Sequence, residues 1–285
     1  MVNNSDANKF QDTFRLNYSY YFDQFGSEQE FFESAQKWIN DNYFIIVLGR
    51  LHKVDGEQYI LLFFNHQYFP VEEVKGHLKD GLCFAFRSDQ FKGYSMRNRL
   101  KDYGFLAYSI QESIPLMGND YRLIKNIFEL IARETKMPSS EIHSTILVAY
   151  LNLLLQHMQR FYQWSLANRL DECKLLQQNF INELHTYFDR KANRFIALPT
   201  LASLAKKLDH TTQFLNDVSL KTSGSTAQHH IDNFIVTIAK ELLAETDLSV
   251  AEIAKKMHFI EPQSLNRLFK RKAKVTPLDY RISII

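Results

Sequence analysis

The chain has 285 residues, and its 34 Lys and Arg against 32 Asp and Glu give a formal net charge of +2. This length predicts two domains, each long enough to bury its own core. No run of about 18 apolar residues occurs, which argues against a membrane-spanning helix. The polar start MVNNSDANKF is unlike a signal peptide, and only two cysteines, Cys83 and Cys173, occur far apart, so we expect a reducing cytoplasm.

The N-terminal region is predicted to be rich in β-strands. Ser27 and Glu30 have the spacing of a capping box, which predicts a helix that ends near residue 40. Asp55-Gly56 is a hairpin signal between two apolar runs. The predicted strands cover residues 43–49, 59–64, 81–86 and 103–110.

Nothing in this region predicts an enzyme or a metal site. Its histidines, His52, His66 and His77, are scattered and lack the close pairing of a metal site, and no hydrolase, zinc-protease or phosphate-loop motif occurs. We therefore expect no catalytic residue, no metal and no cofactor. A set of aromatic residues either forms the core or lines a pocket for an apolar or ring-shaped effector. These residues are Phe63, Phe64, Tyr68, Phe69, Phe84, Phe86 and Phe91.

Long helices are predicted between about residues 121 and 190. One of them runs over 140–164 and carries an apolar stripe whose members alternate four and three residues apart, a spacing typical of a coiled coil. The stripe consists of Leu147, Leu151, Leu154, Met158 and Phe161. It either forms a dimer interface or packs within the chain. A further helix over about 167–190 leads to the polar tetrad 191–194, which we interpret as the domain boundary.

The C-terminal region contains two similar helical pairs. In the first, over about 198–224, Leu201, Leu204, Ala205 and Leu208 form an apolar stripe, Thr211 or Thr212 caps a second helix, and Gly224 ends it. A linker helix over roughly 228–245 follows. In the second pair, over about 249–274, Ser249 and Glu252 form a capping box and Pro262 begins the second helix.

The second helix of the second pair has an apolar back and a basic front. At 100° per residue, one stripe contains Leu265, Leu268, Phe269 and Ala273. The opposite side contains Gln263, Arg267, Lys270 and Lys274, with Arg271 beside them. Residues 250–285 hold eight Lys or Arg against three acids, a charge of +5, which leaves −3 on the rest of the chain. Concentrated basic charge of this kind is typical of a surface for a polyanion.

These residues resemble the DNA-binding domain of the AraC/XylS family of bacterial transcription regulators. The resemblance is carried by Ile253-Ala254, Phe259, Arg267-Leu268-Phe269-Lys270, Thr276-Pro277 and Tyr280-Arg281, which match the family pattern without a gap. From about residue 81 onward the chain resembles the members common in Bacteroidetes-type bacteria. The resemblance implies two helix-turn-helix units joined by a linker helix, preceded by a small β-barrel (cupin-like) sensor domain.

The sequence departs from the family pattern at four positions, one of which is Leu220, where members frequently have lysine. His258 and Lys274 stand where members usually have glycine, so we expect positive φ angles that cost a side chain about 1 kcal/mol or more. Asp217 stands where a basic or polar groove residue is common, and its charge repels phosphate. We therefore expect the first unit to contribute less affinity than the second, or to read a different base pattern.

The sequence predicts an α+β protein with a sensor and dimerisation domain over 1–190, β-rich at about 43–110, and an all-α DNA-binding domain over 195–285. Its two reading helices are expected to enter successive major grooves about 34 Å apart. Arg267 is the expected base reader, and Lys272 joins the phosphate contacts. The predicted DNA-binding residues are Thr212, Gln213, Asn216, Lys221, Gln263, Ser264, Asn266, Arg267, Lys270 and Arg271.

The expected partners are double-stranded DNA, a small-molecule effector and a second copy of the chain. Two alternatives stay open at this point. The chain could keep the helix-turn-helix fold but have lost specific DNA binding, and act as an interaction or ligand-binding protein. It could also be a small-molecule-binding or enzymatic barrel with accessory helices.

Overall fold

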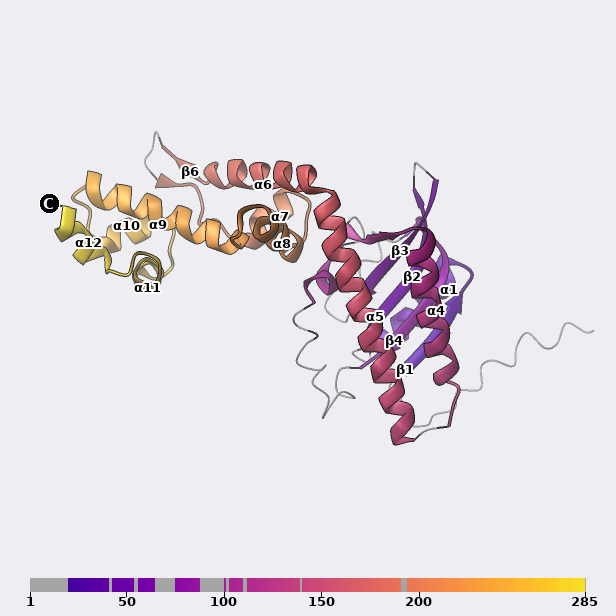
Figure 1. Ribbon diagram of the computed structural model, residues 1–285. Helices are drawn as coiled ribbons and strands as arrows, with labels where there is room; N and C mark the ends of the chain where they lie inside the picture. The colour runs from indigo at the N-terminus through magenta and orange to yellow at the C-terminus, as the bar shows by residue number, and fades with distance from the viewer. Residues whose placement is uncertain are drawn as a thin grey trace, which may run out of the picture. The chain divides into compact units, whose positions relative to one another are not determined.

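The computed structural model describes residues 20–40, 43–53, 56–64, 75–87, 100, 103–109, 112–138, 140–190 and 194–284. The chain forms two compact units (Figure 1). The first comprises residues 1–100 and 115–154, and the second comprises residues 101–114 and 155–285. The segment 101–114 therefore belongs to the same unit as the C-terminal helices. The predicted domain boundary between residues 190 and 195 stays a prediction.

The first unit is built on an open five-stranded sheet with the order β1-β4-β2-β3-β5. The strands are β1 (Tyr20–Phe25), β2 (Phe44–Lys53), β3 (Gly56–Phe64), β4 (Leu78–Phe86) and β5 (Ile114–Leu116). The pairs β1–β4, β4–β2 and β2–β3 are antiparallel. In the described part of the chain β1 and β5 are edges that do not pair with each other, so the predicted closed barrel is wrong.

Helices cover both faces of this sheet, which explains why it need not close to bury its apolar side chains. Successive side chains of β1 point to opposite faces. The Phe25 ring lies 5.0 Å from that of Phe31 on α1 (Glu28–Asn40), whereas the Phe22 ring lies 6.3 Å from that of Phe128 on α4 (Gly118–Glu134). The central strand β2 is accordingly buried on both faces.

Most of the strands predicted from the sequence are confirmed. The runs 43–49 and 59–64 lie in the hairpin β2–β3, and 81–86 lies in β4. The strand predicted over 103–110 is wrong, because Gly104–Ala107 forms the 3₁₀ turn η3. The aromatic residues Phe63, Phe64, Phe84 and Phe86 are core residues. Tyr68, Phe69, Phe91 and His66 lie outside the described residues.

Helix α5 (Glu141–Asn168) carries the apolar stripe that was predicted either to form a dimer contact or to pack internally. All of its members, at 0–5% exposure, are buried within this single chain: Leu147, Leu151, Leu154, Met158 and Phe161. Side chains already covered by their own chain offer no surface to a second copy. The structure therefore favours internal packing of this stripe. Leu153 and Trp164 remain exposed on the same helix.

In the second unit, helices pack around one shared core. They are α6 (Leu170–His185), α7 (Leu201–Lys207), α8 (Thr212–Ser223), α9 (Ala227–Glu245), α10 (Val250–Lys256), α11 (Pro262–Ala273) and α12 (Pro277–Ile284). A short pairing of β6 (Phe188–Asp189) with β7 (Arg194–Phe195) follows α6. The linker helix α9 is the central element, since α7, α8, α10, α11 and α12 all contact it (Figure 1).

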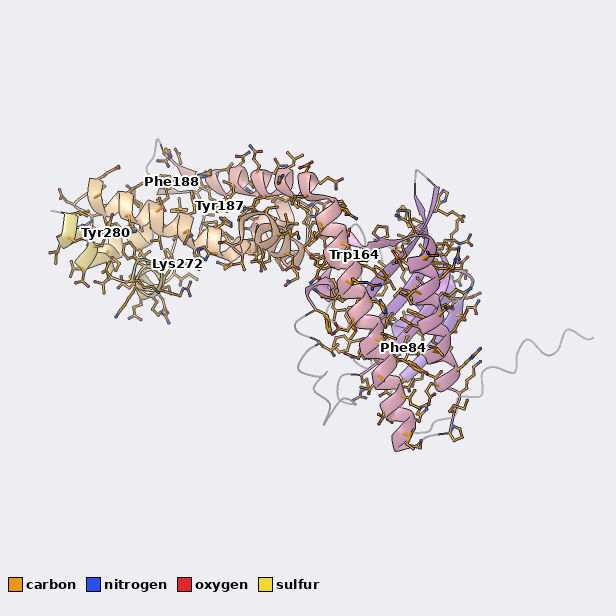
Figure 2. The ribbon with its side chains drawn as sticks, viewed as in Figure 1. Phe84, Trp164, Tyr187, Phe188, Lys272 and Tyr280 are labelled. Carbon is orange, nitrogen blue, oxygen red and sulfur yellow. The ribbon has the colours of Figure 1, made fainter. Side chains whose placement is uncertain are left out.

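The core of this unit extends beyond the two predicted helical pairs. Phe180 and Leu184 of α6 belong to the same buried cluster as the apolar faces of α8, α9 and α11. So do Tyr187 and Phe188 after α6, which Figure 2 labels. α6 therefore supports the helical pairs directly. No helix in the described ranges combines the length and the apolar character needed to cross a bilayer.

Replacing Phe25 by Ala should lower the free energy of unfolding by about 3–5 kcal/mol. The reason is that its ring is 1% exposed and packs against Phe31. Gln24→Ala, the adjacent but exposed position in β1, should change this free energy by less than about 0.5 kcal/mol. Urea unfolding followed by circular dichroism measures both variants. Equal losses would contradict the assignment of the two faces.

Candidate nucleic-acid interface

The second helix-turn-helix unit forms from strong local signals. Ser249 and Glu252 make the predicted capping box of α10: the Glu252 amide donates to Ser249 Oγ at 3.3 Å, and the Ser249 amide donates to Glu252 Oε2 at 2.8 Å. In the turn, His258 has φ 61°. This confirms the positive φ predicted for it because the family usually has glycine at this position. Its Nε2 lies 2.9 Å from the carbonyl oxygen of Phe195, so the turn is tied to β7.

The apolar back of α11 is buried and its polar front is exposed. Leu265 and Phe269 lie in the shared core at 1% and 0% exposure. Because an α-helix turns 100° per residue, burying these two positions directs Arg267 and Lys270 to the outside. The exposed residues of the predicted interface are Gln263, Asn266, Arg267, Lys270 and Arg271, and Ser264 beside them is half-buried. The structure brings these six residues together on one helix.

The Arg267 side chain is exposed and only loosely held. It is 75% exposed, its Nη2 donates to Ser264 Oγ at 3.4 Å, and its distance to the Glu261 carboxylate is 4.0 Å. Exposed pairs at such distances contribute little to stability. The guanidinium is therefore free to exchange these partners for a ligand with better geometry.

An acidic residue of the linker helix anchors the opposite edge of α11. Asp232, whose side chain is 12% exposed, accepts from Arg271 Nη2 at 2.8 Å and lies 3.7 Å from Lys272 Nζ. Gln228 donates to the same carboxylate at 2.8 Å. Lys272 was predicted to contact phosphates. Its side chain is only 17% exposed and faces Asp232 instead. Arg271 keeps 64% exposure and can contact both Asp232 and a ligand.

Helix α12 is locked to the end of α9 by one arginine. Arg281 donates from all three guanidinium nitrogens to the carbonyl oxygens of Leu243, Thr246 and Leu248, at 3.1, 3.1 and 2.7 Å. The Leu243 and Thr246 carbonyls are at the C-terminal end of α9, where no further helical amide can reach them, and the Leu248 carbonyl lies in the connection to α10. Arg281 is therefore a structural residue of this unit.

The first helix-turn-helix unit has the same local design. Thr200 and Ser203 form a capping box on α7, Thr211 caps α8, and Gly224 ends α8 with φ 72°. Thr212 and Lys221 of the predicted interface are exposed. Gln213 and Asn216 are half-buried, and Gln213 Nε2 donates to Asp217 Oδ1 at 3.1 Å. The two helix-turn-helix units therefore differ in how far the polar side chains of their second helices, α8 and α11, are exposed.

The electrostatics of the first unit centre on two carboxylates. Burial raises the pKa of Asp217, against hydrogen bonds from Gln213 and Tyr162 that lower it. Burial alone would also raise the pKa of Glu112, but hydrogen bonds from His210, Thr211 and Ser109 hold it below its ordinary value. Burial and the Asp217 carboxylate raise the pKa of the Tyr162 hydroxyl. Tyr162 therefore stays protonated and donates to Asp217 at 3.2 Å.

Comparison with known proteins agrees with this geometry. A family model described as a helix-turn-helix domain matches residues 204–283. The uncharacterized HTH-type transcriptional regulator YtdP of Bacillus subtilis is 29% identical over 38% of this chain and 13% of its own length. The lactose operon transcription activator of Staphylococcus xylosus is 20% identical over 61% of this chain and 60% of its own length.

Among solved structures, the C-terminal domain of the response regulator yesN from Fusobacterium nucleatum is 32% identical. The match covers 39% of this chain and 98% of that one, with a TM-score of 0.31. The C-terminal region of this chain is an AraC-family helix-turn-helix domain. The chain spans less than two thirds of the length of the two curated relatives. The comparisons do not test the resemblance to Bacteroidetes-type members, which stays a prediction.

Two features of this AraC-family domain escaped the sequence analysis. Asp232 could have been noticed as an acid between Ile231 and Ile235 on the buried side of the linker helix. The contacts that segment 103–114 makes with α8 had no local signal, because about a hundred residues separate the partners in sequence. In the described part of the chain, no group of three or more His, Cys, Asp or Glu side chains could hold a metal ion.

Replacing Lys274 by Gly should raise the free energy of unfolding of the AraC-family domain by about 0.5–1 kcal/mol. Lys274 ends α11 with φ 65°, a conformation in which any Cβ is strained. Lys274→Ala keeps the Cβ and should leave stability nearly unchanged, so it is the matched control. Thermal unfolding measures both, and an equal gain in the two variants would contradict this explanation.

Proposed function

We propose that this chain is a sequence-specific DNA-binding transcription regulator whose second helix-turn-helix unit makes the principal contact. The observation that carries the proposal is the front of α11, where basic and amide side chains are exposed together while Leu265 and Phe269 hold the back in the core. A major groove accepts one α-helix, and this combination of residue types matches the groups that bases and phosphates present there.

Each residue of this front has a proposed role. Arg267 binds guanine O6 and N7 with its two-pronged guanidinium, while Gln263, Ser264 and Asn266 contact neighbouring bases. Lys270 and Arg271 bind phosphates and position the helix. Because Arg271 is also paired with Asp232, its phosphate contact is coupled to the orientation of α11.

The first helix-turn-helix unit is proposed to contribute Thr212, Gln213, Asn216 and Lys221 to DNA binding. Thr212 and Lys221 are exposed at opposite ends of α8 and suit phosphate contacts. Gln213 and Asn216 suit base edges, although both are half-buried. Its contribution to affinity is therefore proposed to be the smaller one.

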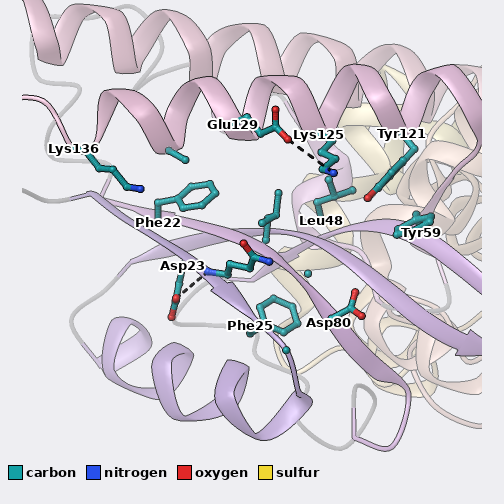
Figure 3. A pocket seen from close by; sticks show the side chains of 15 residues that line it. Phe22, Asp23, Phe25, Leu48, Tyr59, Asp80, Tyr121, Lys125, Glu129 and Lys136 are labelled. Atoms are coloured by element: carbon teal, nitrogen blue, oxygen red, sulfur yellow. Dashed lines mark hydrogen bonds and ion pairs between the residues drawn. The ribbon is translucent and has the colours of Figure 1, made fainter. Parts of the chain in front are cut away.

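The first compact unit, residues 1–100 and 115–154, offers a site for a small-molecule effector. A cavity of about 1040 Å³ lies between α4 and the sheet, and Figure 3 shows Tyr121, Lys125 and Glu129 on its α4 side. Phe22, Tyr59 and Asp80 line its strand side. Aromatic rings beside a few charged groups are typical of small-molecule sites. We propose that an effector binds here. Of the aromatic residues that the sequence suggested as its lining, the four that the structure describes, Phe63, Phe64, Phe84 and Phe86, do not line it.

The mutation pair Arg267→Ala and Lys270→Ala tests the roles on α11. Arg267→Ala should reduce discrimination between the preferred duplex and a random one by about 1–3 kcal/mol. Lys270→Ala should weaken binding to both duplexes alike and reduce the salt dependence by about one phosphate contact. The preferred duplex is obtained by selection from a random pool with the full chain, and fluorescence anisotropy at several salt concentrations gives the affinities.

Glu172→Gln, an exposed position on α6 that is remote in sequence from both reading helices, serves as a charge control. If the full chain selects no sequence, the chain has kept the fold without specific DNA binding, which is the alternative function. If Arg267→Ala leaves discrimination unchanged, the role assigned to this arginine is wrong.

The cavity is tested by filling it. Ala132→Trp, on the α4 wall, should abolish stabilisation by any compound that raises the melting temperature of the natural chain in a screen of small metabolites. DNA affinity without compound should be unchanged, because Ala132 lies outside the second compact unit, which contains both helix-turn-helix pairs. A compound that stabilises both chains equally binds elsewhere.

A further inference from the structure

The segment that precedes β5 packs on the first reading helix. Residues 103–109 and 112–114 lie in the second compact unit, and η3 contacts α8. The Tyr108 ring lies 5.2 Å from Phe214 and 5.0 Å from Tyr162, with edge-to-face geometry in both pairs. Tyr103, Phe105 and Tyr108 are buried. Residues 103–109 and 112–114 therefore pack within the second compact unit, against the first helix-turn-helix pair.

One carboxylate of the segment occupies the N-terminus of α8. Glu112 Oε1 accepts from the Thr211 amide at 2.8 Å and lies 3.1 Å from His210 Nδ1, and Oε2 accepts from Thr211 Oγ1 at 2.7 Å. The Ser109 amide donates to Oε2 at 2.9 Å. The Glu112 side chain is 1% exposed. An anion held by a backbone amide and a hydroxyl at a helix start has the same chemistry as a phosphate contact of a DNA-binding helix.

The segment also covers the side of α8 that would face the bases. Tyr108 donates its hydroxyl to Asp217 Oδ2 at 2.8 Å. A Cβ added to Gly104 would lie 2.6 Å from Gln213 Nε2 and 2.8 Å from Asp217 Oδ2, so the backbone of η3 lies directly on these two side chains. Since Gly104 has no side chain, the close approach is allowed. DNA and this segment cannot occupy that side of α8 together.

The two reading helices can be compared position by position. Both have twelve residues and end at a residue with positive φ, Gly224 in α8 and Lys274 in α11. Counting back from these ends, Gln213 corresponds to Gln263 and Asp217 to Arg267. On α11 both positions are exposed, and no side chain caps its N-terminus. On α8 the same positions and the N-terminus are occupied by segment 103–114.

We infer that segment 103–114 is an internal competitor of DNA on the first reading helix, with Glu112 in the place of a phosphate and Tyr108 and Gly104 over the base-reading side. The inference rests on the proposed DNA-binding function. In this arrangement only the second helix-turn-helix unit is free to bind DNA. Helix α8 can enter a groove once the segment has left α8. Asp217, unfavourable toward DNA, is a suitable partner for tyrosine hydroxyls in the closed arrangement.

The connectivity of the chain suggests what could release the segment. Segment 103–114 runs directly into β5 and α4, and α4 forms one wall of the effector cavity. A ligand that shifts α4 would therefore act on a chain segment that is covalently continuous with the competitor. Closed and released arrangements would then differ in population, and the ligand would favour one of them by its differential affinity.

Glu112→Gln and Tyr108→Phe test the inference in the full chain. Each removes part of the contact without changing a residue of the reading helix, so each should increase affinity for the selected duplex, by about tenfold for the pair combined. The region of DNA protected from hydroxyl radicals should lengthen by about one helical turn, since α8 now reaches a second groove. The probe is a duplex of about three helical turns selected by the natural chain.

Glu172→Gln removes the same charge outside the contact and should change neither quantity by more than about twofold. Hydrogen exchange of residues 103–109 and 211–217 reports whether the segment has been released, and Tyr108→Phe serves if Glu112→Gln does not fold. Released segments with unchanged affinity and an unchanged protected region would overturn the inference and leave the proposed function standing. A chain that selects no DNA, with or without the substitutions, would overturn both.

Discussion

The burial of Leu265 and Phe269 against the linker helix is the constraint on which the proposed interface depends. These side chains join a core that also contains α6, α8 and α9, so α11 cannot rotate about its axis without exposing apolar surface. Burying a leucine and a phenylalanine contributes about 1.5–3 kcal/mol each. The exposed positions of Arg267 and Lys270 follow from that burial and from helical geometry. The Asp232–Arg271 ion pair then adds a polar contact on the other edge of the helix.

The same core holds α8, but the polar side of α8 contacts tyrosine hydroxyls of its own chain. Helices α8 and α11 have the same length and both end at a residue with positive φ, but the side chains at matching positions differ in charge, Asp217 in α8 and Arg267 in α11. An aspartate in that place favours hydroxyl donors over phosphates, and Tyr108 and Tyr162 supply them. The sequence change and the packing of segment 103–114 are therefore consistent with each other.

In the first compact unit, helices on both faces explain why the sheet stays open. A barrel buries one face of its sheet by closing on itself. Here α1 and α4 cover opposite faces, as the alternating contacts of Phe25 and Phe22 require. The cavity lies where α4 and the strands do not meet completely, and its wall combines tyrosine rings with charged side chains.

The sequence by itself determined the features that depend on residues close together in the chain. Capping at Ser249, the end of α8 at Gly224, the positive φ of His258 and Lys274, the hairpin β2–β3 and the two faces of α11 all follow from local geometry and periodicity. Only the tertiary structure decided whether the sheet closes, that the stripe on α5 is buried, that Lys272 faces Asp232, and that segment 103–114 covers α8. These depend on contacts between distant segments, and amphipathic periodicity states that a face is buried without stating which surface buries it.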